Sequence, residues 1–110
     1  MVTVSGKKEK TGYVFSCSEL RTVVFPVFEQ YGVKRAILFG SYAKGLATIY
    51  SDVDILVDSG LKGLRFIGLM EALKGALGGK AVDLIDVAHV EKNSAIDLEI
   101  QQTGVLLYEK

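Results

Sequence analysis

Two short apolar runs with a polar stretch between them constrain most strongly what this chain can fold into. They bound the segment "ILFGSYAKGLATIYSDVDILV", which extends from Ile37 to Val57. Short runs that are continuously apolar are typical of strands covered on both faces, as in an α/β sheet. A Gly-Ser pair follows the first run, and two aspartates open the second. The segment therefore predicts two buried strands whose ends carry polar side chains.

The residues before this segment carry the pattern of a helix. Ser16 and Glu19 stand three residues apart, as in the capping box that marks the start of many helices. Apolar residues then recur at helical spacing as far as Gly32, which ends the pattern. Pro26 falls inside the helix, and we expect it to kink the helix or to shorten its first half.

Strand and helix patterns alternate through the rest of the chain. A helix is predicted over residues 61–77, where the Gly78-Gly79 pair stops it, and another near residues 93–102. The predicted order is α-β-α-β-α-β-α-β, which favours a single α/β domain with a mixed sheet flanked by helices. The other predicted elements are strands over residues 33–39, 52–57, 80–87 and 105–109 and a short helix within residues 40–50.

Length and charge narrow the class of protein. The 110 residues suit one domain, which we place at residues 16–110 behind a flexible arm over residues 1–15. Lys plus Arg and Asp plus Glu both number 13, so no overall field favours nucleic acid or an anionic membrane as a partner. Cys17 is the only cysteine, and the sequence shows neither a signal peptide nor an apolar run of membrane-spanning length. We therefore expect a cytoplasmic protein.

Three aspartates stand where strands can carry them toward a common site. Asp52 and Asp54 lie two residues apart, so they project from the same face of their strand. Carboxylates this close repel each other unless a cation lies between them, and Mg²⁺ is a natural partner. Asp83 would join them if its strand is a neighbour in the sheet, and three carboxylates can hold two Mg²⁺ ions for phosphoryl or nucleotidyl transfer. Unrelated capping and surface contacts are the alternative.

The Gly40-Ser41 pair predicts a phosphate site. A glycine directly after a buried strand permits a tight turn and the close approach of the backbone to an anion. A short helix starting at Ser41 would direct its free N–H groups toward that anion, and Lys44 adds a cation one turn later. Ordinary turn chemistry, with glycine for geometry and serine as N-cap, explains the pair equally well on its own.

Two other phosphate and metal motifs are excluded. Gly40 and Gly45 have the spacing of a P-loop, but Leu46 and Ala47 stand where that loop requires Lys and Ser or Thr. The stretch "DVDILVD" fails as an EF-hand loop, because its third acidic position and its glycine position are apolar.

The spacing of the Gly-Ser pair and the two aspartates resembles a known signature. Gly40-Ser41, ten intervening residues and then Asp52-Val53-Asp54 resemble the signature of the nucleotidyltransferase superfamily that includes the polymerase-β palm. The stretch over residues 31–57 is similar to the minimal nucleotidyltransferases of prokaryotes, as are "KAVDLIDV" and "GVLLYEK" further on. The likeness covers the chain from Ser18 onward. It implies a single-domain fold of the polymerase-β palm type.

The resemblance also implies roles for the acidic residues. Asp52 and Asp54 would bind both Mg²⁺ ions, and Asp83 would complete one metal site and help to deprotonate the nucleophile. Asp86 is a rival for Asp83, but strand alternation puts it on the opposite face of the sheet. Asp83 is therefore preferred.

On the nucleotide side, the resemblance implies that Gly40 and Ser41 hold the triphosphate of the substrate, which is usually ATP. Lys44 stands where the family often has Arg, and it would contact a phosphate. The three carboxylates and this turn would together form the catalytic site of a nucleotidyltransferase.

The size of the chain is similar to that of the antitoxin halves of toxin–antitoxin pairs, whose partner is a helical HEPN-type ribonuclease. The resemblance therefore implies an adenylyltransferase that transfers AMP from ATP to a tyrosine hydroxyl of such a toxin. Two alternatives stay open: nucleotidyl transfer to a small molecule such as an aminoglycoside, and a non-catalytic module of the same fold that only covers a partner. The sequence also leaves open whether the chain forms a homo-oligomer.

Overall fold

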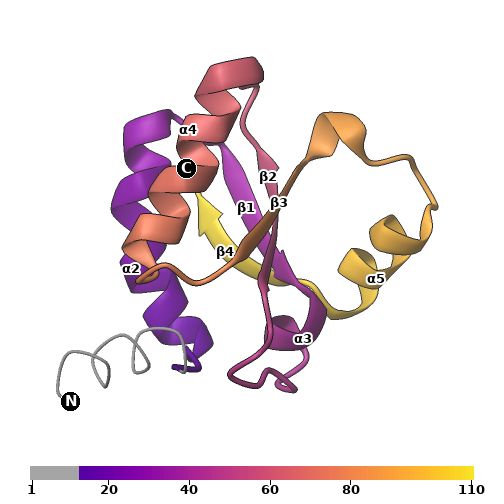
Figure 1. The fold of residues 1–110 in the computed structure, drawn as a ribbon. Helices are drawn as coiled ribbons and strands as arrows, with labels where there is room; N and C mark the ends of the chain where they lie inside the picture. The colour runs from indigo at the N-terminus through magenta and orange to yellow at the C-terminus, as the bar shows by residue number, and fades with distance from the viewer. Residues whose placement is uncertain (1–12) are drawn as a thin grey trace, which may run out of the picture.

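Four strands form one mixed sheet in the order β3-β2-β1-β4 (Figure 1). The structure is a computed structural model that describes residues 13–110, so most of the arm predicted over residues 1–15 lies outside the described residues. β1 runs antiparallel to β2 and β4, whereas β2 and β3 are parallel, which confirms the predicted mixed sheet. The strands are β1 (Arg35–Phe39), β2 (Val53–Asp58), β3 (Val82–Asp86) and β4 (Val105–Glu109).

Helices alternate with these strands in the predicted order. Their observed ends differ from the predicted ones by a few residues, and a 3₁₀ turn follows β3. The short helix predicted within residues 40–50 is confirmed, and it ends before Gly45, which takes a left-handed backbone conformation. The helices are α2 (Cys17–Tyr31), α3 (Gly40–Ala43), α4 (Gly63–Ala76), η1 (Val87–His89) and α5 (Ala95–Thr103).

Helix α2 begins with the predicted capping box. The Ser16 hydroxyl accepts a hydrogen bond from the Glu19 backbone N–H at 3.1 Å, and the Glu19 carboxylate accepts one from the Ser16 N–H at 2.8 Å. The helix then continues through Pro26 to Tyr31, so proline does not shorten it, and the kink that was the other expectation stays a prediction. Val24 and Phe28 on either side of Pro26 are fully buried. Their packing holds both halves of α2 against the sheet and offsets the lost backbone hydrogen bond.

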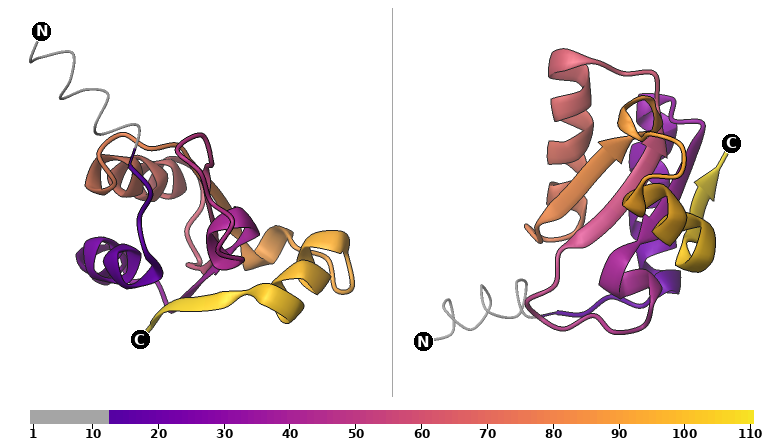
Figure 2. Two further views of the ribbon diagram at one scale, coloured as in Figure 1. Left: turned by 90° about the horizontal axis from the view of Figure 1, so that it is seen from below. Right: turned by 90° about the vertical axis from the view of Figure 1, so that its right-hand side faces the viewer.

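Helices α2 and α4 cover one face of the sheet, whereas α3 and α5 lie on the other side of the strands (Figure 2). Alternate strand residues point into the core under α2 and α4, as the two-residue period of a strand requires. Phe15, the last residue of the predicted arm, also packs against this core. The fully buried strand residues of this core are Ala36, Leu38, Val53, Ile55 and Val57, and the fully buried helix residues are Leu20, Val24, Phe28, Leu69 and Leu73.

The opposite face of the sheet is only partly covered. Helix α5 packs against β1 and α3, and Ile37 on this face is only half-buried. The prediction that both faces of these strands are covered is therefore confirmed for the face under α2 and α4. It is only partly correct for the opposite face. Within residues 13–110, every helix is too short or too polar to cross a bilayer.

Candidate active site

The structure places the three predicted aspartates around the start of β2. Asp54 and Asp83 are direct partners in the parallel register of β2 and β3, so they project side by side from the same sheet face. The two strands are thus neighbours, as the prediction for Asp83 required. Asp52 is exposed and directly precedes β2. Asp54 lies in β2, Asp83 lies in β3 and Asp52 directly precedes β2. The first residues of β2 lie beside the turn that follows β1.

The Asp54 carboxyl has a perturbed pKa. Burial raises it most, and the negative charges of Asp83, Asp52 and Glu99 raise it further, to about 6. An ordinary aspartate has a pKa near 4. Without a cation, part of the Asp54 population is therefore protonated in mildly acidic solution. A divalent cation among these carboxylates would favour the ionised form and lower the pKa again.

Gly40 meets this carboxylate directly. It follows β1, whose last residue Phe39 is the register partner of Asp54. Gly40 has a left-handed backbone with φ of +71°, and a Cβ atom at this position would overlap a carboxylate oxygen of Asp54. Only glycine provides both the backbone conformation and the space. The half-buried Ser41 comes next, so the structure brings the predicted phosphate turn and the predicted metal ligand together.

Lys44 contacts a residue that the sequence did not single out. It lies at the end of α3, and its Nζ is 3.3 Å from Oε2 of Glu99 on α5. Glu99 also acts on Asp54 through its charge, so α5 contributes an acidic group beside the predicted site. No motif marks Glu99 in the sequence, because its position depends on how α5 packs against α3 and β1.

Lys80 is a second residue that the sequence analysis missed. Its side chain is buried, and its Nζ donates a hydrogen bond to the Ile49 carbonyl oxygen at 3.3 Å. The same ammonium lies 6.0 Å from the centre of the Tyr42 ring, within the range of a cation–π contact. Tyr42 is buried, and burial raises the pKa of its hydroxyl. Lys80 therefore ties the segment before Asp52 to the start of β3.

Asp86, the rival of Asp83, has a different environment. Its carboxylate is buried and accepts hydrogen bonds from the N–H and hydroxyl of Ser59 and from the Ala88 N–H at 3.0 Å. These bonds join the end of β3 to the segment after β2. Both carboxylate oxygens of Asp86 are therefore engaged in hydrogen bonds that stabilise the fold. This geometry favours Asp83 over Asp86 as the third acidic residue of the site.

The donor chemistry of the site suits Mg²⁺. Within residues 13–110, no three His, Cys, Asp or Glu side chains already surround one point as a complete metal site would. Mg²⁺, however, binds proteins through one or two carboxylates and completes its shell with water and substrate phosphates. Asp54 and Asp83 supply such a pair, and the charges that act on Asp54 are those a cation would neutralise. Two ions held by three carboxylates stay a prediction.

Comparison with known proteins identifies the family. The family described as "Polymerase beta, Nucleotidyltransferase" matches residues 24–110. The chain therefore belongs to the polymerase-β nucleotidyltransferase family, as the resemblance in the sequence predicted. It is similar to a Methanocaldococcus jannaschii protein whose name assigns it provisionally to the protein adenylyltransferases, with 39% identity over 70 residues, 62% of this chain and 74% of that relative. It is also similar to the protein adenylyltransferase MntA of Thermococcus cleftensis, with 48% identity over 61 residues, 52% of this chain and 59% of that relative.

Solved structures share the fold. A chain provisionally named a minimal nucleotidyltransferase aligns with a TM-score of 0.68 and 27% identity, covering 86% of this chain and 98% of its own. A toxin–antitoxin crystal structure with AMP-PNP gives a TM-score of 0.69 at 23% identity, over 82% of this chain and 73% of that one. A complex of tri-AMPylated Shewanella oneidensis HEPN toxin with its MNT antitoxin gives a TM-score of 0.64 at 20% identity. The alignment covers 86% of this chain and 73% of the matched chain. These likenesses confirm the predicted α/β fold.

Proposed function

We propose that this chain is a protein adenylyltransferase that transfers AMP from ATP to a tyrosine hydroxyl of a HEPN-type toxin and so acts as its antitoxin. One observation carries the proposal. The adjacent carboxylates of Asp54 and Asp83 adjoin the Gly40-Ser41 turn in a chain of the polymerase-β nucleotidyltransferase family. The names of the two sequence relatives support protein as the acceptor.

The reaction assigns a task to each part of the site. The tyrosine oxygen bonds to the α-phosphorus of ATP, and the bond from this phosphorus to the oxygen leading to the β-phosphate breaks. Pyrophosphate leaves, and the phenol proton passes to a carboxylate, which we assign to Asp83. Gly40 and Ser41 bind the triphosphate, and Lys44 contacts a phosphate oxygen. The reaction takes place in the cytoplasm, the compartment expected from the sequence.

The carboxylates provide the metal ligands in this proposal. Asp52 and Asp54 hold the ions, and Asp83 completes one of the two sites. Mg²⁺, when bound, neutralises phosphate charge and activates the attacking hydroxyl. The exposed position of Asp52 suits this role, because an ion that arrives together with the nucleotide can reach its carboxylate.

The partner is proposed from the structural neighbours. Two of them are toxin–antitoxin structures, one with AMP-PNP and one with a tri-AMPylated HEPN toxin. The present chain shares their fold and has the acidic pair and turn described above. A HEPN-type toxin is therefore the acceptor to test first.

Nucleotide binding and AMP transfer test this function separately. Thermal unfolding with Mg²⁺ and each nucleoside triphosphate should show stabilisation by ATP, about 2.7 kcal/mol at 100 times the dissociation constant. Asp54→Asn should lose this stabilisation, whereas Glu71→Gln, on the exposed surface of α4, should keep it. Mass spectrometry of the Shewanella oneidensis HEPN toxin after incubation with the chain, ATP and Mg²⁺ should then show AMP on tyrosine.

The other outcomes point to other functions. Stabilisation by ATP together with AMP transfer to an aminoglycoside, and none to the toxin, would replace the proposal by small-molecule nucleotidyl transfer. Tight toxin binding that is unaffected by Asp54→Asn, without stabilisation by any nucleotide, would replace it by a non-catalytic module.

A further inference from the structure

The partly covered sheet face carries its side chains in three rows that cross the strands. Strand alternation and register define them, because residues directly paired on neighbouring strands project from the same face. The first row lies at the candidate active site, the second is apolar and the third is charged. They consist of Phe39, Asp54 and Asp83, then Leu106, Ile37, Leu56 and Ile85, and finally Glu109, Arg35 and Asp58.

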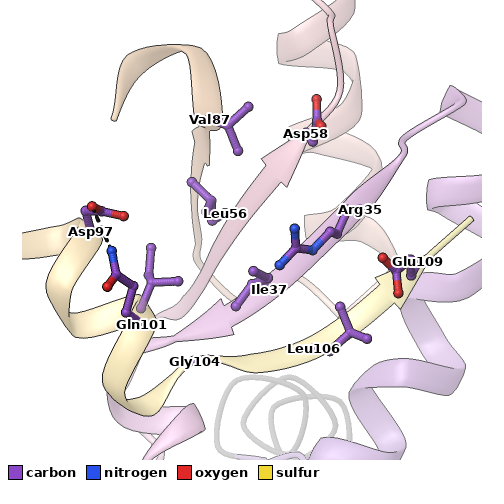
Figure 3. Close-up of a pocket in the computed structure, with 11 residues that line it drawn as sticks. Arg35, Ile37, Leu56, Asp58, Val87, Asp97, Gln101, Gly104, Leu106 and Glu109 are labelled. Atoms are coloured by element: carbon purple, nitrogen blue, oxygen red, sulfur yellow. Dashed lines mark hydrogen bonds between the residues drawn. The ribbon is translucent and has the colours of Figure 1, made fainter. Parts of the chain in front are cut away.

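Three residues of the apolar row, Ile37, Leu56 and Leu106, form the floor of a hollow. This hollow has a volume of about 530 Å³ and lies between the sheet and α5, with Asp97 and Gln101 on one side and Arg35 and Glu109 on the other (Figure 3). Leu106 in the floor is 45% exposed, a large fraction for a leucine in a strand. Ile37 is half-buried and Leu56 is only 9% exposed, so Leu106 is the most accessible part of the floor.

The rim of the hollow is mainly negative. Asp58, Asp97 and Glu109 contribute three carboxylates, and Arg35 contributes the one positive charge among the described lining residues. Arg35 stands between Asp58 and Glu109 in the register, but it forms no ion pair with either among the described residues. A partner segment with basic side chains around an apolar one would therefore complement this rim.

The hollow lies one row of side chains away from the candidate active site on the same sheet face. Leu56 in its floor is two residues from Asp54 on the same face of β2, a separation of roughly 7 Å along a strand. A residue held against Leu56 would therefore bring its neighbours in the chain close to the carboxylates. The opposite face, under α2 and α4, offers no such route because it is filled by the hydrophobic core.

We propose that this apolar row is the docking site for the acceptor protein, and that it takes a segment in which an apolar side chain lies near the acceptor tyrosine and is flanked by lysine or arginine. This inference rests on the proposed function, because that function requires a protein acceptor. The apolar side chain packs on Leu56, Ile37 and Leu106, and the basic side chains face Asp58, Asp97 and Glu109.

A peptide binding experiment tests the docking site without requiring catalysis. The probe is a fluorescein-labelled peptide with one tyrosine, two leucines and flanking lysines, compared with the same peptide carrying glutamates in place of the lysines. Fluorescence anisotropy should show binding of the lysine peptide that is at least tenfold tighter. NMR of the labelled chain should place the largest shift changes at Ile37, Leu56 and Leu106.

Matched variants identify the face that binds. Leu106→Gln should weaken binding roughly tenfold, since it removes apolar area from the contact. Leu64→Gln changes an 84% exposed leucine on α4, away from this face, and should leave affinity unchanged. Glu109→Lys should reduce the preference for the lysine peptide. Asp54→Asn should bind the peptide normally although it transfers no AMP. If the unchanged chain binds the peptide but transfers no AMP to any protein, the proposed function is contradicted and the docking site stands.

Four results would overturn the docking site. The first is absence of binding by either peptide. The second is equal binding of both peptides. The third is a set of shift changes centred on α2 and α4. The fourth is self-association of the chain in light scattering that Leu106→Gln abolishes and Leu64→Gln does not, because the face would then belong to a second copy.

Discussion

Gly40 and Asp54 lie so close together that a single methyl group on residue 40 would overlap an oxygen of the Asp54 carboxylate. The contact joins the turn after β1 to the start of β2, which are separate motifs in the sequence. Glycine is therefore required at position 40 for two reasons. Any side chain there would collide with Asp54, and the backbone φ of +71° is unfavourable for other residues. The two requirements can be measured separately.

Gly40→Ala should destabilise the chain and inactivate it. A left-handed backbone costs alanine about 1–2 kcal/mol, and the new methyl group would also displace Asp54. We expect AMP transfer to fall at least roughly tenfold, since small displacements of a positioning group have effects of this size. Urea unfolding and the rate of AMP transfer measure the two effects.

Gly45→Ala is the matched control for this experiment. Gly45 has a similar φ of +74°, but a Cβ there meets nothing within 4 Å. It should show the backbone cost without a comparable loss of activity. Equal loss of activity in both variants would mean that strain in the turn, and not the contact with Asp54, determines the effect.

The raised pKa of Asp54 predicts how stability depends on pH without metal. Because the folded-state pKa is about 6 and the usual value is near 4, the folded chain holds this proton more tightly than the unfolded chain. Stability should therefore fall as pH rises from about 4 to about 6. The side chain is partly exposed, so we expect a change of roughly 1 kcal/mol. Asp54→Asn should be the more stable protein at pH 7 in EDTA, and the difference should vanish below pH 4.

The same pKa predicts the acid limb of the activity profile. Metal binding requires the ionised carboxylate, so AMP transfer at low Mg²⁺ should fall as pH drops through about 6. Higher Mg²⁺ competes with the proton and should move this midpoint to lower pH. A midpoint that does not respond to Mg²⁺ would exclude Asp54 as the group that titrates.

Two similarly exposed lysine pairs allow a direct test of Lys44. Lys44 pairs with Glu99 at 3.3 Å and Lys74 with Glu71 at 3.7 Å, and both lysine side chains are 40% exposed. Lys44→Met and Lys74→Met should each change the free energy of unfolding by less than about 1 kcal/mol, as is usual for such pairs. Only Lys44→Met should raise the KM for ATP, because only Lys44 lies at the end of the phosphate turn. An unchanged KM would remove Lys44 from the site.

Much of this fold and part of its site could be predicted from local sequence patterns. The capping box at Ser16, the apolar strand runs and the two-residue spacing of Asp52 and Asp54 are local, and they gave the element order and the acidic pair. The choice of Asp83 over Asp86 followed from strand alternation, and the structure supports it through the buried bonds of Asp86. These features depend only on neighbours in the chain.

The residues that were missed depend on contacts between distant parts of the chain. Glu99 reaches the site because α5 packs beside α3. Lys80 contributes because its ammonium donates a hydrogen bond to the Ile49 carbonyl oxygen in the segment before β2. The apolar row likewise exists only once the register of the strands is known. No local pattern carries this information.

Lys80 supplies the last prediction, because it holds the segment that leads to Asp52. Lys80→Met keeps an apolar side chain of similar length but leaves the Ile49 carbonyl oxygen without its donor. A hydrogen bond that involves a charged group contributes about 1.5–3 kcal/mol, so the free energy of unfolding in urea should fall by roughly this amount. Hydrogen exchange should accelerate at residues 48–51, and the Mg²⁺ concentration needed for half-maximal AMP transfer should rise. Lys92→Met, at an exposed position, should change none of the three. If Lys80→Met altered stability alone, the lysine would serve the fold and not the placement of Asp52.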